Sequence, residues 1–424
     1  MAEPGFAALA AALLAPAAAM PPEVADLLAW LGLARGDAAA PHRARLLRAA
    51  AGFERIFQLE APAAPGLVVF GAEVAPDALA AAPGLGVMGV SGTGTTPLAA
   101  LESCIGEGIE LLSQVETPAD LAQQRATPPP GATVALPPHW PLAGPGWLPL
   151  RRLDGAGAAW LPAGLCLRRP GAVPPWPLSL GCAAGPSLEA AALHGLLELL
   201  ERDAAALWWR GGLRPRPLAL EQPGLAGAVA LLAQLRGGTT GRQSWLLDIS
   251  TELGVPVVAA VSVAADGGGF CCGTAARLDL AAAAGAALRE LCQMELAVAV
   301  VAAKQAEAGP AALNARDLGH LRRFHGIRPA RCTLLHPRGA PRPVAAAPPA
   351  PAAESLARLV ARLGAQGLHP LLLPLTRPSL AVPCCRVVCP GLEVEPARLI
   401  GPRLQAAMVE TGGGDCVTDG IPLM

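Results

Sequence analysis

The stretch that decides the fold is GCAAGPSLEAAALHGLLELLERDA, residues 181–204. It opens with a glycine-containing turn, and residues 187–209 then repeat apolar side chains at the spacing of a long helix. Glu198 and Glu201 lie three residues apart, so their carboxylates share one face of that helix. Like charges at this spacing slightly destabilise a helix, so the pair becomes informative if it recurs.

Two further predicted helices, at residues 95–114 and 279–303, carry polar side chains at the same spacing. These side chains are Ser103, Glu107 and Glu110 in the first helix, and Glu290 and Gln293 in the second. A single pair is most simply a solvent-facing pair. Three such pairs are harder to explain in this way, because only 15% of the residues are charged. If the helices converge, five carboxylates and one amide share one site.

Such a cluster of carboxylates needs a counter-cation, and hard carboxylate oxygens suit Mg²⁺. A di-iron helical bundle would use Glu-x-x-His, which does not accompany these pairs. The P-loop pattern G-x-x-x-x-G-K-[ST] does not occur either. Magnesium bound together with a polyphosphate is therefore the better physical interpretation.

Composition excludes several classes of protein. The chain has 424 residues, 53% of them hydrophobic, and a formal net charge of −1, so it is neither disordered nor generally attracted to nucleic acid or anionic membranes. The apolar N-terminal stretch, residues 6–20, lacks the preceding positive charge of a signal peptide, and residues 281–303 contain four polar groups. Eleven cysteines without CxxC spacing predict buried, reduced thiols. We expect a soluble, cytoplasmic protein.

The rest of the chain predicts both helices and strands. Helical spacing of apolar residues extends over residues 22–33, 42–59 and 354–363. Short apolar runs that predict strands occur at residues 66–71, 245–247, 255–263, 370–375 and 386–389. A proline- and alanine-rich linker is expected at residues 340–352. This mixture favours the α+β class.

These motifs resemble those of the YcaO family. That family's central helix typically ends in E-x-x-E-R-D-A, which is matched here by Glu198, Glu201, Arg202, Asp203 and Ala204. The two other helices match its S-x-x-x-E-x-x-E and E-x-x-Q patterns, and residues 390–393 resemble its late P-G-L-E segment. The resemblance covers residues 66–424. Residues 1–65 are an N-terminal helical segment of unknown role.

The resemblance implies an α+β, YcaO-like fold with mixed sheets, in which three long helices converge on a Mg-nucleotide site. It implies ATP and Mg²⁺ as cofactors. The implied cofactor-binding residues are Ser103, Glu107, Glu110, Glu198, Glu201, Arg202, Glu290 and Gln293. The implied metal ligands are Glu107, Glu110, Glu198, Glu201 and Glu290.

Family members activate a peptide backbone amide by phosphorylating its oxygen, which then leaves as phosphate. The resemblance thus implies an ATP-dependent cyclodehydratase that converts Cys, Ser or Thr to thiazole- or oxazole-type azolines in a ribosomally made peptide (a RiPP). The alternatives are thioamide formation with a TfuA-like partner and a non-catalytic nucleotide- or peptide-binding scaffold.

Several positions depart from the family pattern and motivate the scaffold alternative. Thr93 stands where the family often has Lys, Leu111 where Arg is usual, and Pro186 and Ala190 where Asn and Glu are usual. The resemblance therefore implies that several phosphate or nucleotide contacts of the family are absent here or supplied by other residues.

The expected partners are a precursor peptide and a separate protein, which is either a leader-peptide-binding protein or a TfuA-like protein. The sequence gives no indication of nucleic-acid or membrane binding, and a homodimer is compatible with it. For a catalytic role the sequence offers Arg202 and Pro422 as candidates. Arg202 is explained equally well by charge complementarity at the C-terminus of its helix or by an ion pair with Asp203 or Glu198. Pro422 lies in an apolar tail, residues 421–424, which we expect to dock inward near the active site.

Overall fold

The computed structural model describes residues 5–14, 21–34, 36–142, 144–239, 241–343, 350–397 and 399–424. Two compact units account for the chain. The first comprises Met1–Glu60, Val68–Leu196 and Pro351–Pro390, and the second comprises Ala61–Leu67, Leu197–Ala350 and Gly391–Met424. The described residues up to Glu60 thus belong to the same unit as most of the first half of the chain. A domain boundary at residue 65 remains a prediction.

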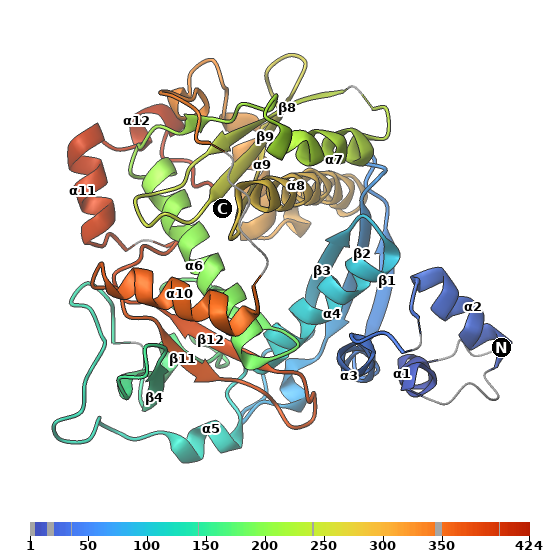
Figure 1. The fold of residues 1–424 in the computed structure, drawn as a ribbon, viewed down its shortest axis with the longest axis vertical. Coiled ribbons are helices and arrows are strands. Elements are labelled where there is room, and N and C mark those ends of the chain that lie inside the picture. Colours follow the sequence, from blue (N-terminus) through green and yellow to red (C-terminus); the bar gives the residue numbers. More distant parts are fainter. Residues whose placement is uncertain are drawn as a thin grey trace. The chain divides into compact units, whose positions relative to one another are not determined.

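A three-stranded antiparallel sheet lies in the first unit, in the order β1-β2-β3. Its strands are β1 (Arg55–Leu59), β2 (Val68–Val74) and β3 (Met88–Gly94). Helix α4 (Pro97–Ser113) runs along β2 and β3 (Figure 1). The other face of α4 meets three N-terminal helices, α1 (Phe6–Leu14), α2 (Pro22–Leu31) and α3 (Ala40–Ala50), in one apolar core.

The helix expected over residues 42–59 is correct only in its first part. Helix α3 ends at Ala50, and β1 occupies the second part. The apolar residues of this segment fit a helical and an extended spacing, and the ladder with β2 decides between them. In that ladder Phe57 pairs with Gly71 and its ring covers the glycine, a cross-strand contact that a helix would forgo.

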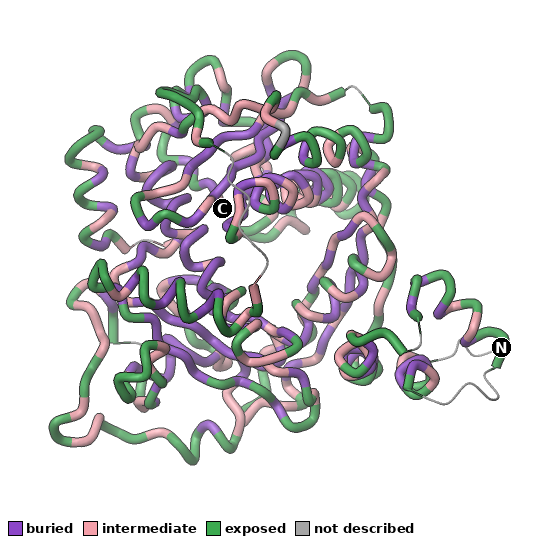
Figure 2. The backbone as a smooth tube through the Cα atoms, in the orientation of Figure 1, coloured by how far each residue is buried: buried purple, intermediate pink, exposed green. Residues whose placement is uncertain are grey.

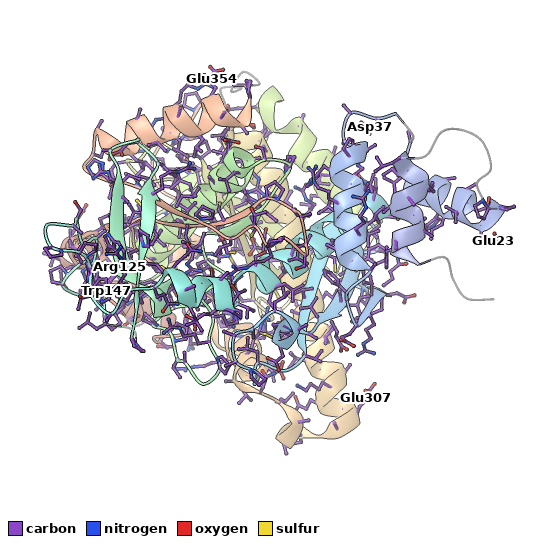
Figure 3. All side chains as sticks on the ribbon, turned by 90° about the horizontal axis from the view of Figure 1, so that it is seen from below. Glu23, Asp37, Arg125, Trp147, Glu307 and Glu354 are labelled. Carbon is purple, nitrogen blue, oxygen red and sulfur yellow. The ribbon has the colours of Figure 1, made fainter. Side chains whose placement is uncertain are left out.

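The first unit also holds a five-stranded antiparallel sheet, in the order β5-β4-β11-β12-β6. Its strands are β4 (Trp147–Arg152), β5 (Ala158–Pro162), β6 (Cys182–Ala184), β11 (Leu371–Pro374) and β12 (Cys384–Val388). Two helices belong to this part of the chain, α5 (Pro118–Gln123) and α10 (Ala352–Gly364). Arg125 and Trp147 lie side by side and exchange two backbone hydrogen bonds of 3.1 and 2.8 Å (Figure 3).

A four-stranded antiparallel sheet, in the order β10-β9-β8-β7, forms the centre of the second unit. Its strands are β7 (Arg216–Pro217), β8 (Arg242–Asp248), β9 (Val257–Ala264) and β10 (Cys271–Ala276). The helices are α7 (Ala226–Arg236), α8 (Leu280–Ala308), α9 (Ala315–Gly326), α11 (Pro402–Thr411) and α12 (Asp415–Thr418). Helix α8 packs on β9 and β10, and β9 is buried along nearly its whole length (Figure 2).

Helix α6 (Leu188–Trp209) belongs to both units, to the first up to Leu196 and to the second from Leu197. Helix α4 lies in the first unit and α8 in the second. The convergence of all three helices on one site remains a prediction.

The α+β class is confirmed by these three sheets and their covering helices. The expectation of mixed sheets is corrected in one respect, because every pairing between the named strands is antiparallel. Several neighbouring strands are joined by short connections, which allow hairpins but not parallel crossovers. Ten of the eleven cysteines are buried or half-buried, all eleven are free thiols, and Cys416 is exposed.

Two stretches singled out in the sequence lie partly outside the described residues, namely residues 15–20 of the apolar N-terminal stretch and residues 344–349 of the expected linker. Among the residues that are described, no helix is long and apolar enough to cross a membrane. The longest helix, α8, instead buries Glu295, which forms ion pairs with Arg236 at 2.6 Å and Arg242 at 2.9 Å.

Candidate functional site

The carboxylates of α4 are oriented by backbone N–H groups of two strands in the first unit. Ser91 N of β3 donates to Glu107 Oε2 at 3.2 Å, and Ala184 N of β6 donates to Glu110 Oε1 at 2.8 Å. Ser103 and Glu107 are exposed and Glu110 is half-buried, whereas Leu101, Ile105, Ile109 and Leu112 are buried. The polar face expected on this helix is therefore confirmed.

The glycine-rich segment before α4, residues 91–94, is the end of strand β3. A Cβ atom on Gly92 would lie 2.0 Å from Cys104 N of α4, and one on Gly94 would lie 2.6 Å from Ala100 N. The glycines therefore allow a close approach of strand and helix. This approach brings the N–H of Ser91 within reach of Glu107.

The substituted positions offer little to a nucleotide in the first unit. Thr93 lies within β3 and pairs with Val69 of β2. Leu111 packs against the apolar core of the N-terminal helices. Pro186 is exposed and has no N–H to donate, and Ala190 has no polar side-chain atom. Contacts that the family residues at these positions make are therefore either absent from this chain or supplied by other residues.

In the second unit, strand β10 holds carboxylates from two helices. Glu201 of α6 accepts hydrogen bonds from the Thr274 hydroxyl at 2.7 Å and from Ala276 N at 3.3 Å. Glu290 of α8 accepts a hydrogen bond from Thr274 N at 3.1 Å. Gly273 makes this possible, because a Cβ atom there would lie 2.2 Å from Leu291 N of α8. Thr274 thus donates hydrogen bonds to both Glu201 and Glu290.

Arg202 is the cation next to these acids. Its Nη2 lies 3.6 Å from Glu201 Oε1 and 3.8 Å from Glu198 Oε1. Burial lowers the pKa of Arg202, but Glu201, Glu198, Glu290 and Glu395 outweigh it and the net shift is upward. The ion pair with Glu198 considered from the sequence is present, whereas Asp203 is engaged by other residues.

The pKa of Glu290 is raised by its burial in the acidic cluster. Burial first, and then the neighbouring charge of Glu201, raise its pKa to about 8, against the lowering effect of Arg202 and of Thr274 N. Three glutamates beside one arginine leave excess negative charge, so their oxygens fit a divalent cation. Gln293 follows Glu290 by three residues on α8 and is half-buried.

No group of three or more His, Cys, Asp or Glu side chains is arranged to hold a metal by itself in the part of the chain that the structure describes. Mg²⁺ at phosphate-transfer sites typically takes one or two carboxylates and completes its shell with phosphates and water. The assignment of Glu107, Glu110, Glu198, Glu201 and Glu290 as metal ligands remains a prediction.

Asp203, the acid of the E-R-D-A motif, is structural. It is fully buried and accepts two hydrogen bonds from the Arg403 guanidinium at 2.9 and 2.7 Å and one from Glu393 N at 2.9 Å. Glu393 in turn accepts hydrogen bonds from Gly401 N and Leu404 N, both at 3.0 Å, at the start of α11. The central and late motifs are therefore joined by a buried polar network.

The C-terminal tail docks within the second unit, as expected. Ile421 and Leu423 are buried, and Trp209 Nε1 donates to the carbonyl oxygen of Ile421 at 2.7 Å. Arg202 Nη1 contacts the Met424 thioether. Pro422 is exposed, so the tail residue that reaches Arg202 is Met424, which the sequence analysis did not single out. A catalytic role for the tail remains a prediction.

Three comparisons place this arrangement among known proteins. A curated protein of Rhizobium leguminosarum bv. trifolii, described as an uncharacterized protein in the tfuA 3′ region, is 28% identical over 239 residues. The match spans 51% of this chain and 52% of that relative's length. This chain therefore matches about half of that protein.

Two solved structures share the fold. The first is a heterocyclase in complex with substrate and cofactor, with a TM-score of 0.64, 22% identity, and coverage of 85% of this chain and 52% of that chain. The second is YcaO from Methanopyrus kandleri bound with AMPPCP and Mg²⁺, with a TM-score of 0.61, 23% identity, and coverage of 83% and 89%. These similarities confirm the YcaO-like fold.

The family model described as YcaO cyclodehydratase, ATP- and Mg²⁺-binding, matches residues 91–393. These residues include every implied cofactor-binding side chain and the P-G-L-E segment. The chain thus belongs to the YcaO family, with ATP and Mg²⁺ as its cofactors.

Proposed function

We propose that this protein uses ATP and Mg²⁺ to activate a backbone amide of a ribosomally made peptide, and that it cyclises Cys, Ser or Thr side chains onto that amide to form azolines. Family membership supports the ATP-dependent chemistry. The observation that carries the proposal is the placement of Thr274, which donates hydrogen bonds to both Glu201 and Glu290. Such preorganised groups lower the reorganisation cost of phosphoryl transfer.

Each group of residues has a role in this proposal. Glu198, Glu201 and Glu290 in the second unit, and Glu107 and Glu110 in the first, would hold Mg²⁺ and the phosphates. Mg-ATP, when bound, would supply the phosphoryl group that makes the amide oxygen a good leaving group.

The polar residues beside these carboxylates complete the proposed site. Arg202 would offset negative charge on the transferred group, since it already lies against Glu198 and Glu201. Ser103 and Gln293 would orient the nucleotide by hydrogen bonds.

Thioamide formation is the second candidate reaction, and one relative favours it. The curated protein from R. leguminosarum is named for its position beside tfuA, which favours thioamide formation with a TfuA-like partner. The azoline alternative calls for a leader-peptide-binding partner in addition to the precursor peptide. The non-catalytic scaffold is a third alternative, since Thr93, Leu111, Pro186 and Ala190 lack the family's polar groups.

Nucleotide binding is tested first, because it needs no peptide. Isothermal titration with Mg²⁺ and a non-hydrolysable ATP analogue compares Glu198→Gln/Glu201→Gln with a matched control, Glu307→Gln/Glu354→Gln. Both double variants remove two negative charges, and Glu307 and Glu354 lie at the surface on α8 and α10 (Figure 3). We expect at least a tenfold loss of affinity in the first variant only. Equal affinities in the two variants would contradict the proposed site.

The reaction itself is read from the mass of the peptide. Incubation with ATP, Mg²⁺ and the peptide encoded nearest the gene should yield loss of water if azolines form. Replacement of oxygen by sulfur, in the presence of a TfuA-like protein and a sulfide source, would instead support thioamidation. Nucleotide binding with neither product and no ATP consumption would favour the scaffold.

A further inference from the structure

A single segment of the second unit concentrates positive charge. Residues 309–343 contain seven arginines and only one acidic residue, Asp317, in a chain whose net charge is −1. Asp317 is already paired with Lys304 at 2.7 Å. The segment consists of α9 and the loop that follows it, and the proposed nucleotide-binding residues lie outside it.

Three contacts hold the loop of residues 328–338 together and against the segment that carries Arg214. The carbonyl oxygen of Pro329 contacts His336 Nε2 at 2.8 Å, the carbonyl oxygen of His336 accepts from Arg214 Nη2 at 2.5 Å, and Arg338 N donates to the carbonyl oxygen of Pro215 at 2.8 Å. We call the resulting surface the basic surface; its members are Arg214, Arg328, Arg331 and Arg338.

Buried anchors fix the loop that carries the basic surface. Trp208 Nε1 donates to the carbonyl oxygen of Leu334 at 2.9 Å, and Trp245 Nε1 donates to that of Leu335 at 3.3 Å. Leu334 and Leu335 are themselves buried. The backbone that carries the arginines is therefore held by buried contacts, which lowers the entropy that a ligand must remove on binding.

The charge of the basic surface is not neutralised within the described residues, where none of its four guanidinium groups lies in an ion pair with a carboxylate. Asp248 is paired with Arg342 at 3.0 Å. The Asp266 carboxylate and the Arg328 guanidinium both lie close to Gly268. Burial, and then repulsion from Arg338, lower the pKa of Arg214.

We propose that the basic surface binds an acidic stretch of the peptide substrate, rich in Asp and Glu. This proposal rests on the proposed function, because it takes the peptide as the anion. A peptide fits better than nucleic acid, because the remainder of the chain has an excess of acidic residues that repels a long polyanion. A short acidic segment meets only the basic surface. Such contacts attract and align a peptide, and they weaken with salt.

The test measures peptide binding without ATP or Mg²⁺, so that it is independent of catalysis. The probe is a fluorescein-labelled nonapeptide of alternating Glu and Ala, and its partner probe has Gln in place of every Glu. Fluorescence anisotropy compares Arg328→Gln/Arg331→Gln with the control Arg358→Gln/Arg362→Gln. All four arginines are exposed and both changes remove two positive charges, so the overall field changes equally.

We expect the Glu peptide to bind more tightly than the Gln peptide, and its affinity to fall about fivefold in Arg328→Gln/Arg331→Gln, the scale of two exposed ion pairs. The control should retain the affinity, and added salt should weaken it. Equal binding of the two peptides, or equal losses in both variants, would overturn the proposal. So would tighter binding of a single-stranded oligonucleotide of the same charge. If nucleotide binding or peptide modification fails while these peptide affinities are as expected, only the proposed function is refuted.

Discussion

Thr274 of β10 donates its hydroxyl hydrogen to Glu201 of α6 at 2.7 Å. Its backbone N–H donates to Glu290 of α8 at 3.1 Å, so one residue positions acids from two helices. Both Thr274 and Glu201 are buried, and water cannot replace the hydroxyl at low cost.

Replacing Thr274 by Val tests this bridge, because valine keeps the shape and removes the hydroxyl. The buried Glu201 oxygen loses a donor, so we expect the free energy of unfolding to fall by about 1–3 kcal/mol. Affinity for the Mg-bound ATP analogue should fall as well, since Glu201 is no longer held. Urea unfolding and calorimetry measure the two effects. Thr333→Val, at an exposed threonine, is the control, and matching behaviour of the two variants would contradict the bridge.

Mg²⁺ with a non-hydrolysable ATP analogue should raise the melting temperature. A ligand that binds only the folded state at a hundred times its Kd adds about 2.7 kcal/mol to stability. The excess negative charge around Glu290 adds a reason for the metal to be needed, so EDTA should abolish the shift. Differential scanning fluorimetry provides the measurement. A melting curve that Mg-nucleotide leaves unmoved would mean that the acidic pairs do not form a Mg-nucleotide site.

Removing the C-terminal tail should lower the stability of the fold as well as the activity. Ile421 and Leu423 are buried, so deletion of residues 421–424 should lower the free energy of unfolding by about 3 kcal/mol or more. The smaller change Met424→Ala removes only the contact with Arg202 and should preserve most of that stability. If the tail shapes the active site, Met424→Ala should still reduce peptide modification roughly tenfold, the scale of a misplaced group. Full activity in that variant would assign the tail to packing.

His320 should make the protein sensitive to acid. Burial, and then Arg323 and Arg316, lower its pKa to about 4, from an unfolded value of 6.5. A lowered pKa means that the unfolded state binds the proton more tightly, so stability is full above pH 6.5 and declines as the pH falls toward 4. Chemical unfolding at pH 7 and pH 5 should show a smaller loss in His320→Gln than in the wild type. The exposed His325→Gln serves as the control and should lose as much stability as the wild type.

Much of the fold could be read from local patterns. The helices at α4, α6 and α8 and the strands β8 and β9 follow from apolar spacing and from the glycines and polar residues that flank them. The second half of the segment at residues 42–59 could not be read in this way. Its apolar residues suit either structure, and only pairing with β2 makes it β1. Likewise, the amino-acid sequence of residues 91–94 does not by itself distinguish a turn from a strand that packs closely on α4.

The sequence by itself determined which side chains are candidates for the site, because spacing along a helix fixes which residues share a face. It therefore identified Glu107, Glu110, Glu198, Glu201 and Glu290. Only the tertiary structure decided what holds and surrounds them, namely Thr274, the backbone N–H groups of Ser91 and Ala184, and Met424 beside Arg202. The reason is physical: helical periodicity is a local property of the chain, whereas a hydrogen bond between residues 73 positions apart exists only after strand and helix have packed together.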